Sequence, residues 1–398
     1  MTANTTVFTF ANPTDLILEI PTATQNQADV RSQSFSNPTS GYQGYINQLC
    51  LSAVLLWLQE DFTPQAKVWP NTTVLSSFWE LVNGTAITLD ATRFILIPSE
   101  TIDLSELRVP QEWVDIPSWV GDYYLAVQVE PDEGYVRVWG YCTHAQLKSQ
   151  GSFDPGDRNY SLDATDIIND ISVLAVARQL CPEEPTRSAI EEILTIPQPQ
   201  AQNLIARLGN PEILTPRLAI PFQLWGGLIE HGGWRKSLYQ RRLGLPEQWS
   251  VIEWLQSGVS QVAETVGWGS FDFQLGAAGA RGIDQRQPGS ILSRQLAMPA
   301  AGYAYAGQIY ELLIIPQREP DTTIWRFELR NLTVGAAIPG GFKLRLLTED
   351  LQPFPNNEDI AITAVEQLFV EVALEPGEGI VWEIEPLPDN YDREILRF

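Results

Sequence analysis

Two side chains that could form a nucleophilic pair, Cys142 and His144, lie two residues apart near the end of a predicted strand. Side chains two apart on a strand project from the same face, so a thiolate could form beside an imidazolium, as in cysteine hydrolases. The same face also carries Val136 and Val138. These apolar neighbours favour a second interpretation, in which Cys142 is a small buried core residue.

Other reactive patterns in the chain are weaker. Adjacent carboxylates such as Asp132 and Glu133 diverge from each other, so paired-carboxylate hydrolysis would need two acids that face each other across an interdomain cleft. The second histidine, His231, has no Cys-x-x-Cys motif with which to form a zinc site. Segment 276–282 is rich in glycine but lacks the Gly-Lys-Ser/Thr ending of a phosphate-binding loop. We therefore expect neither a metal nor a cofactor.

One segment of the chain is strongly basic. It contains six candidate partner-binding residues: Trp234, Arg235, Lys236, Tyr239, Arg241 and Arg242. On a helix Arg235, Tyr239 and Arg242 lie near one face, and Arg, Trp and Tyr are enriched at binding hot spots. Two interpretations stay open. The segment docks an acidic partner, peptide or nucleic-acid phosphate, or its basic side chains pair with the protein's own carboxylates at a domain interface.

The overall charge limits the partners. The 398 residues carry a formal net charge of −24, whereas binding to a phosphate backbone needs clustered Lys and Arg. Nucleic acid is therefore an unexpected partner, and an anionic membrane surface would repel the chain. Three widely spaced cysteines suit reduced thiols, and no signal peptide or membrane-spanning apolar run is evident. These features predict a cytoplasmic protein that does not bind membranes.

The N-terminal part, residues 1–155, combines strand patterns with one helical pattern. The helix is expected to begin near Ser40, at a capping-box spacing, and to end before Pro64. Residues 125–129 and 135–141 alternate in polarity around a turn with proline and glycine, which predicts a β-hairpin. We expect an α+β domain with an antiparallel, small barrel-like sheet and one helix.

The middle part, residues 161–266, changes to a helical period and predicts an all-α domain. Apolar residues recur at intervals of three and four, and proline and glycine interrupt them. A short helix is expected over residues 186–194, one or two more over residues 221–243, and a last one over residues 249–266.

The C-terminal part, residues 285–398, predicts an immunoglobulin-like β-sandwich. Residues 323–330 alternate strictly between large apolar and charged side chains, as a strand with one buried face does. Residues 342–346 and 380–385 repeat this pattern, and turn-forming proline and glycine lie between the segments. At least five short strands at this spacing favour a sandwich, here without a disulfide.

Four short sequence segments spread over the chain resemble those of a known family. They are Phe78–Gly84, Val136–Tyr141, Arg241–Leu245 and Glu371–Gly379. Together they resemble an uncharacterised cyanobacterial family, domain of unknown function 1822, over nearly the whole chain. The resemblance implies a cyanobacterial cytoplasmic protein, and it transfers no catalytic residue because the family has none assigned.

These observations favour a non-enzymatic intracellular protein that acts by interaction, as a regulator or adaptor with a protein partner. The first alternative is a hydrolase that uses Cys142 and His144, or paired carboxylates, in an interdomain cleft. The second is a nucleic-acid-associated regulator that binds through residues 234–242.

Overall fold

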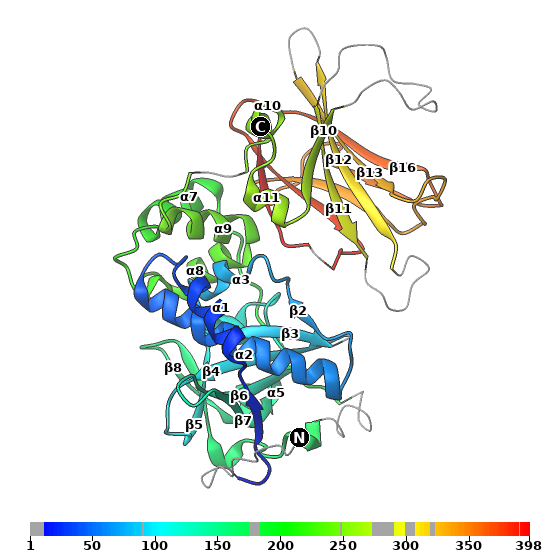
Figure 1. The fold of residues 1–398 in the computed structure, drawn as a ribbon. Coiled ribbons are helices and arrows are strands. Elements are labelled where there is room, and N and C mark those ends of the chain that lie inside the picture. Colours follow the sequence, from blue (N-terminus) through cyan, green and yellow to red (C-terminus); the bar gives the residue numbers. More distant parts are fainter. Residues whose placement is uncertain are drawn as a thin grey trace. The chain divides into compact units, whose positions relative to one another are not determined.

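The structure, a computed structural model, is shown in Figure 1. It describes residues 12–89, 91–174, 184–246, 249–272, 290–298, 307–318, 323–389 and 391–398. The chain divides into two compact units: unit 1 comprises residues 1–194 and 208–230, and unit 2 comprises residues 195–207 and 231–398. The fold is mixed α+β with several sheets, one of which curls into a half-barrel.

The limits of the two units differ from the three domains predicted from the sequence. The predicted limits near residues 155 and 266 fall inside unit 1 and unit 2, respectively. A compact unit is defined by contacts, whereas a domain is also expected to fold alone. The division into residues 1–155, 161–266 and 285–398 therefore stays a prediction.

Unit 1 is built on a six-stranded sheet with the strand order β1-β7-β6-β4-β3-β2. Its strands are β1 (Leu16–Glu19), β2 (Lys67–Trp69), β3 (Thr85–Leu89), β4 (Thr92–Ser99), β6 (Tyr123–Glu130) and β7 (Tyr135–Thr143). The predicted hairpin is confirmed as β6 and β7, which pair antiparallel. Almost every residue of these two strands is buried, as expected for strands that are covered on both faces.

Unit 1 also contains several helices, some of which pack on this sheet. They are α1 (Thr22–Ser32), α2 (Pro38–Asp61), α3 (Leu75–Trp79), α4 (Gln111–Asp115), α5 (His144–Gln150) and α8 (Phe222–Glu230). The longest, α2, packs across five strands of the sheet, and α1 packs against α2 (Figure 1). Asn37 caps α2 by accepting a hydrogen bond from the Ser40 backbone N–H, close to the predicted start.

Two predictions for the N-terminal part are wrong. The sheet is not wholly antiparallel, because β4 and β6 pair in parallel. Parallel neighbours need a crossover connection, and residues 100–122 supply it with β5 (Glu106–Pro110) and α4. The part also contains more than one helix. The sequence signal for α1 is weak because the helix is polar and buries only Ala28.

A small three-stranded sheet completes unit 1. Its strand order is β5-β9-β8, with β8 (Ser152–Asp154) and β9 (Asn159–Asp163). Both pairs are antiparallel, so this sheet joins the crossover segment to the chain that follows α5.

The middle part of the chain is largely helical where the structure describes it. Its elements are η1 (Ala164–Asp166), α7 (Gln198–Leu208), η2 (Pro216–Leu218), α8, α9 (Gly232–Arg242), α10 (Val251–Ser257) and α11 (Gln261–Thr265). The helix predicted over residues 186–194 is absent. The chain is instead held extended, since Thr186 and Ser188 bond to the start of α5. Among the described residues, no helix is long and apolar enough to cross a bilayer.

Unit 2 contains two antiparallel sheets, with the strand orders β10-β11-β12-β13-β16 and β15-β14-β17-β18. The strands are β10 (Trp268–Asp272), β11 (Ser290–Ala297), β12 (Ile309–Arg318), β13 (Thr323–Asn331), β14 (Lys343–Thr348), β15 (Glu358–Ile360), β16 (Gln367–Ala373), β17 (Gly379–Glu385) and β18 (Ile395–Arg397). Strand positions predicted from alternation are confirmed for β13, β14 and β17. The immunoglobulin-like topology stays a prediction.

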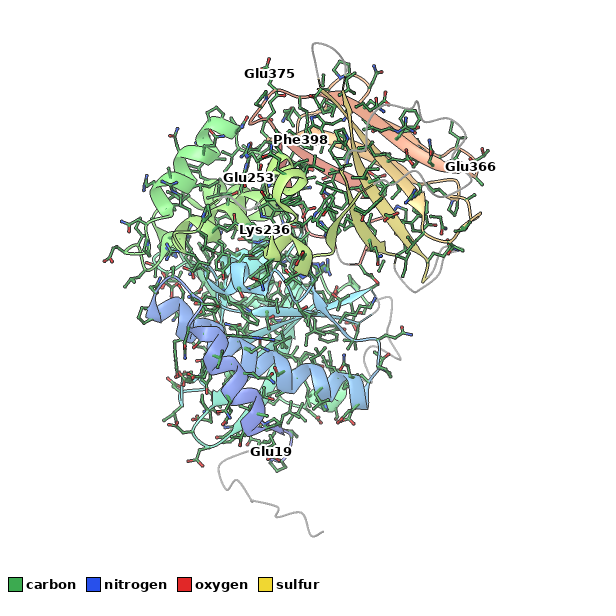
Figure 2. The ribbon with its side chains drawn as sticks, turned by 45° about the horizontal axis from the view of Figure 1, so that its top comes forward. Glu19, Lys236, Glu253, Glu366, Glu375 and Phe398 are labelled. Carbon is green, nitrogen blue, oxygen red and sulfur yellow. The ribbon has the colours of Figure 1, made fainter. Side chains whose placement is uncertain are left out.

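The two sheets of unit 2 share one hydrophobic core. Leu312 and Phe327 enter it from the first sheet, and Leu344 and Trp382 enter it from the second. Phe398 packs edge-on against Trp325, with ring centroids 4.6 Å apart. Carboxylates such as Glu366 and Glu375 lie on the outside (Figure 2). Unit 2 thus has the buried apolar interior and charged exterior that its alternating strands predict.

Candidate functional site

Cys142 lies in the core of unit 1. It is completely buried on β7, where it pairs with Tyr124 of β6. Burial raises the pKa of the thiol to about 12, because the thiolate would lose its hydration. Cys50 is also a buried free thiol, and Cys181 lies outside the described residues. At neutral pH Cys142 is therefore a protonated core side chain.

His144 does not share a strand face with Cys142, because β7 ends at Thr143 and His144 begins α5. Its Nε2 atom lies 3.0 Å from the carbonyl oxygen of Val114, and its Nδ1 atom accepts a 3.0 Å hydrogen bond from the Ser188 backbone N–H. These partners place the proton on Nε2, and burial lowers the pKa of the ring. Both nitrogens are therefore occupied, so His144 is not free to act as the base for Cys142.

His231 has a structural role at the start of α9. Its Nδ1 atom accepts the backbone N–H of Trp234 at 3.3 Å, and its Nε2 atom lies 3.0 Å from the Glu349 carbonyl oxygen. The ring stacks on Trp234, and burial lowers its pKa to about 3. In the part of the chain that the structure describes, no three His, Cys, Asp or Glu side chains gather as a metal site would require. Segment 276–282 lies outside that part.

Helix α9 carries all six predicted partner-binding residues. Four of them, Trp234, Arg235, Lys236 and Arg242, are buried. Tyr239 is half-buried and Arg241 is exposed. The structure thus brings the six residues together on one helix but leaves only part of the group at the surface.

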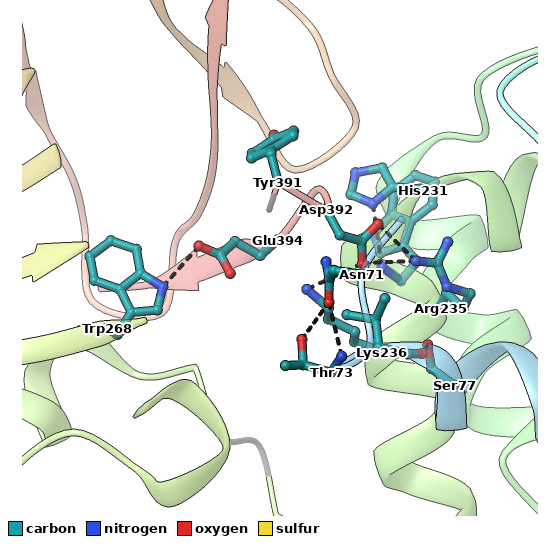
Figure 3. A network of polar contacts seen from close by, with 12 residues as sticks. Asn71, Thr73, Ser77, His231, Arg235, Lys236, Trp268, Tyr391, Asp392 and Glu394 are labelled. Atoms are coloured by element: carbon teal, nitrogen blue, oxygen red, sulfur yellow. Dashed lines mark hydrogen bonds and ion pairs between the residues drawn. The ribbon is translucent and has the colours of Figure 1, made fainter. Parts of the chain in front are cut away.

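The buried basic residues of α9 pair within unit 2. Nη2 of Arg235 lies 2.8 Å from each carboxylate oxygen of Asp392 (Figure 3). Nζ of Lys236 lies 3.3 Å from the same carboxylate and 5.1 Å from the ring centroid of Trp249. These contacts favour the interpretation that the basic side chains neutralise the protein's own carboxylate. A role of α9 in binding a partner stays a prediction.

The C-terminal segment contains a second buried ionic group. One oxygen of Glu394 accepts hydrogen bonds of 2.9 Å from the indole N–H groups of Trp268 and Trp382. Figure 3 shows the contact with Trp268. The same oxygen pairs with Arg294, and both charged side chains are at least 99% buried. Three donors on one oxygen make this carboxylate a structural link between strands and the C-terminal segment, while its second oxygen is buried without a hydrogen-bond partner among the described residues.

A polar depression lies in unit 1. It is lined by Ser105, Glu106, Gln150, Ser152, Ser161, Asp163 and Asp166. The hydroxyl oxygens of Ser152 and Ser161 are 2.9 Å apart and bond to each other. None of the residues singled out as nucleophile or base lines this depression.

A different group of residues on unit 1 combines aromatic, apolar and acidic side chains, all of them exposed except Tyr45, which is half-buried. We name it the acidic–tyrosine surface; it consists of Asp29, Tyr42, Tyr45, Glu100, Ile102 and Asp132. The rings of Tyr42 and Tyr45 are stacked on α2 with centroids 6.1 Å apart. The Tyr42 hydroxyl donates a hydrogen bond to the Glu100 carboxylate. Tyr42 is 50% exposed and Ile102 is 88% exposed.

Hydrogen bonds hold the segments of the acidic–tyrosine surface in place. Gln25 of α1 donates to the Pro131 carbonyl oxygen in the β6–β7 turn at 3.0 Å. Gln128 of β6 donates to the Thr101 carbonyl oxygen at 3.3 Å. These bonds connect α1, the hairpin turn and the segment after β4. The carboxylates therefore stand on an ordered framework.

The tyrosines of this surface respond to the surrounding carboxylates. Burial of part of each ring and the charge of Glu100 and Asp132 raise the pKa of both Tyr42 and Tyr45. Both hydroxyls are therefore protonated at neutral pH, and that of Tyr42 donates its proton to the Glu100 carboxylate. Burial is the larger cause for both rings, and the nearby carboxylates add to it in the same direction.

The acidic–tyrosine surface is not apparent from the sequence. Tyr42 and Tyr45 fall within the helix predicted between Ser40 and Pro64, and the remaining members lie in three other segments. The available signal was the charge distribution. Unit 1 contains 27 Asp and Glu against 10 Lys and Arg, a formal net charge of −17 out of the −24 of the chain.

Comparison with known proteins places the chain in a family. No curated protein and no solved structure matches it. The family model described as "Protein of unknown function (DUF1822)" matches residues 18–397. Because this match covers almost the whole chain, the protein belongs to the DUF1822 family.

Proposed function

We propose that this protein is a non-enzymatic interaction or adaptor protein that acts in the cytoplasm by binding another protein. A cyanobacterial origin, which the family resemblance implies, is part of the same proposal. The observation that carries it is the acidic–tyrosine surface, an exposed aromatic and acidic group on a unit with a formal net charge of −17. Exposed aromatic side chains on an ordered framework are a usual feature of protein-binding surfaces.

The basic residues of unit 1 support this proposal because many are already neutralised. Ion pairs join Arg108 to Glu106 and Asp157, Arg137 to Asp15, Lys148 to Asp115, Arg187 to Asp122, and Arg217 to Glu112. The acidic side chains of the acidic–tyrosine surface have no such counter-ion among the described residues. Its charge is therefore available to a partner.

The contacts of the reactive side chains favour an interaction protein over the alternatives. A hydrolase needs a base free to deprotonate Cys142, and His144 uses both ring nitrogens on backbone groups. A nucleic-acid regulator needs unpaired cations, and Arg235 and Lys236 pair with Asp392. Neither alternative therefore draws support from these residues.

Affinity capture followed by reconstitution tests the proposal. A tagged chain is used to capture a partner from native lysate, and the partner is then purified and its binding remeasured with the pure protein. We expect a saturable complex, and we expect the double variant Cys142→Ala/His144→Gln to bind with unchanged affinity once thermal melting shows that it is folded. Consumption of the captured molecule by wild type, and its loss in this variant, would overturn the proposal.

A further inference from the structure

We infer that the acidic–tyrosine surface docks a Lys- and Arg-rich segment of the partner protein. This inference rests on the proposed function and adds to it the surface and the chemistry of the occupant.

The charge of this surface calls for a cationic partner. Asp29, Glu100 and Asp132 are exposed and stand on three different segments. Helix α1 packs on α2 and bonds to the β6–β7 turn beside Asp132, and Glu100 accepts the Tyr42 hydroxyl. In the described part of unit 1, none of the three forms an ion pair. A basic segment would complement them, whereas nucleic acid or an anionic membrane surface would be repelled.

The two tyrosine rings favour cations that can lie over an aromatic face, such as the guanidinium of Arg and the ammonium of Lys. A tyrosine ring attracts a guanidinium or ammonium group over its face, and the Tyr42 and Tyr45 rings stand beside the carboxylates. The chain itself uses this contact: the guanidinium of Arg93 lies 3.9 Å from the ring centroid of Trp69, and that of Arg326 lies 3.7 Å from the ring centroid of Phe369. A partner arginine has the same chemistry.

The exposed apolar side chain of Ile102 favours a Lys or Arg side chain as the occupant over a small inorganic cation, which has no apolar part to cover it. Ile102 is 88% exposed and lies two residues after Glu100, which Tyr42 holds by its hydroxyl. The long aliphatic stems of Lys and Arg cover such apolar side chains while the charged head reaches a carboxylate. The combination of carboxylate, ring and aliphatic side chain therefore matches the parts of a Lys or Arg side chain.

The framework reduces the entropy that binding would cost. The bonds from Gln25 to Pro131 and from Gln128 to Thr101 hold the hairpin turn and the segment after β4 before any partner arrives. Ordered groups lose less conformational freedom on binding than mobile ones do. We therefore expect a measurable affinity even for a short peptide.

The test uses a fluorescently labelled peptide in which Lys and Arg alternate with Gly, and its binding to the full chain is followed by anisotropy. Wild type is expected to bind it, with an affinity that decreases as salt is added. The variant Glu100→Gln/Asp132→Asn is expected to bind about ten-fold more weakly, which corresponds to about 1.4 kcal/mol.

The matched control is Glu60→Gln/Asp61→Asn. These two carboxylates are exposed at the other end of α2, and the substitution removes the same charge. It is expected to leave binding close to wild type. An equal loss in both variants would show that only the net charge of the chain attracts the peptide, and this would overturn the inference.

The tyrosines are tested with a graded pair of variants. Tyr42→Ala/Tyr45→Ala removes both rings and is expected to weaken binding, whereas Tyr42→Phe keeps the ring and loses only the hydrogen bond to Glu100. Tyr42→Phe is therefore expected to bind more tightly than the double variant. Circular dichroism and thermal melting identify any variant that fails to fold, and equal binding by the two folded variants would contradict a role of the rings.

Failure of this inference is distinguishable from failure of the proposed function. If the reconstituted partner binds wild type and Glu100→Gln/Asp132→Asn equally well, the protein is an adaptor that uses another surface. If no partner can be reconstituted and the peptide does not bind, both the surface and the adaptor function are wrong.

Discussion

Arg235 of α9 and Asp392 of the C-terminal segment form an ion pair in which one guanidinium nitrogen lies 2.8 Å from both carboxylate oxygens. Burial alone would raise the pKa of Asp392, but Arg235 and Lys236 outweigh it and hold that pKa below its usual range. The pair therefore fixes the position of α9 against the C-terminal segment within unit 2. This pairing accounts for the basic residues of α9 in an otherwise acidic chain, with no need for an acidic ligand.

Replacement of Arg235 is expected to destabilise unit 2. Arg235→Ala leaves the mostly buried Asp392 with Lys236 as its one remaining cationic partner among the described residues. Loss of one member of a buried pair costs about 3–5 kcal/mol of unfolding free energy. Urea unfolding, followed by circular dichroism, measures the change.

The control for Arg235→Ala is Arg241→Ala on the same helix. Arg241 is exposed, so its replacement is expected to change the unfolding free energy by about 0.5 kcal/mol or less. Equal effects of the two substitutions would show that the pair with Asp392 contributes nothing specific.

Arg294 and Glu394 are expected to be strongly coupled. Arg294→Met and Glu394→Leu each leave a buried charge without its main partner, so each single variant is expected to lose about 3–5 kcal/mol. The double variant removes both charges and is expected to lose less than the sum of the two, by at least about 1 kcal/mol. Urea unfolding with tryptophan fluorescence reports the effect, because Trp268 and Trp382 contact Glu394.

Additive losses for Arg294 and Glu394 would contradict this coupling. The more exposed pair Arg326 and Glu371 provides the comparison, since its side chains are 19% and 40% exposed. Arg326→Met and Glu371→Leu are expected to couple by about 1 kcal/mol or less.

Local structure could be predicted from the sequence wherever one short segment carries the whole pattern. The alternation in β13 predicts which side chains are buried, because a strand has two faces. The cap of α2 lies close to its predicted position for the same reason. The helix expected over residues 186–194 fails because partners far along the chain, Asp122 and His144, hold Thr186 and Ser188 instead.

The candidate site could not be predicted because its contacts join distant segments. Spacing placed Cys142 and His144 on one strand, whereas the strand ends between them at Thr143. Likewise, nothing near Tyr42 in the sequence indicates that Glu100 lies beside it. Pairing across such separations depends on the topology of unit 1, including the parallel pair of β4 and β6.

Cys142 is expected to resist alkylation in the native protein. It is completely buried, and its thiol has a pKa raised to about 12. Iodoacetamide treatment followed by peptide mass spectrometry is expected to find Cys142 unmodified in the folded chain and modified after urea unfolding. Rapid modification of the native chain at Cys142 would reopen the hydrolase alternative.

Stability is expected to decrease as the pH falls below neutrality. Burial lowers the pKa of His231 to about 3 from an ordinary value of 6.5, so this ring is neutral in the fold. The unfolded chain binds a proton below pH 6.5, and the unfolding free energy falls by at most about 1.4 kcal/mol per pH unit for this histidine. The shift at His144 acts in the same direction.

The variant His231→Asn isolates this contribution. Asparagine is a good N-cap, so it can still accept the Trp234 backbone N–H at the start of α9. Urea unfolding between about pH 7 and about pH 5, above the titration of ordinary carboxylates, is expected to show a shallower pH dependence for this variant. The same slope as wild type would contradict the assignment to His231.

The most direct test of a protein that works through its surface is the dissociation constant of the reconstituted partner for three folded chains. These are wild type, Cys142→Ala/His144→Gln, and Glu100→Gln/Asp132→Asn. We predict equal affinity for the first two and about ten-fold weaker binding for the third. The account would be contradicted if the third chain bound the partner as tightly as wild type does and if, in addition, wild type and the third chain changed the partner chemically while Cys142→Ala/His144→Gln did not.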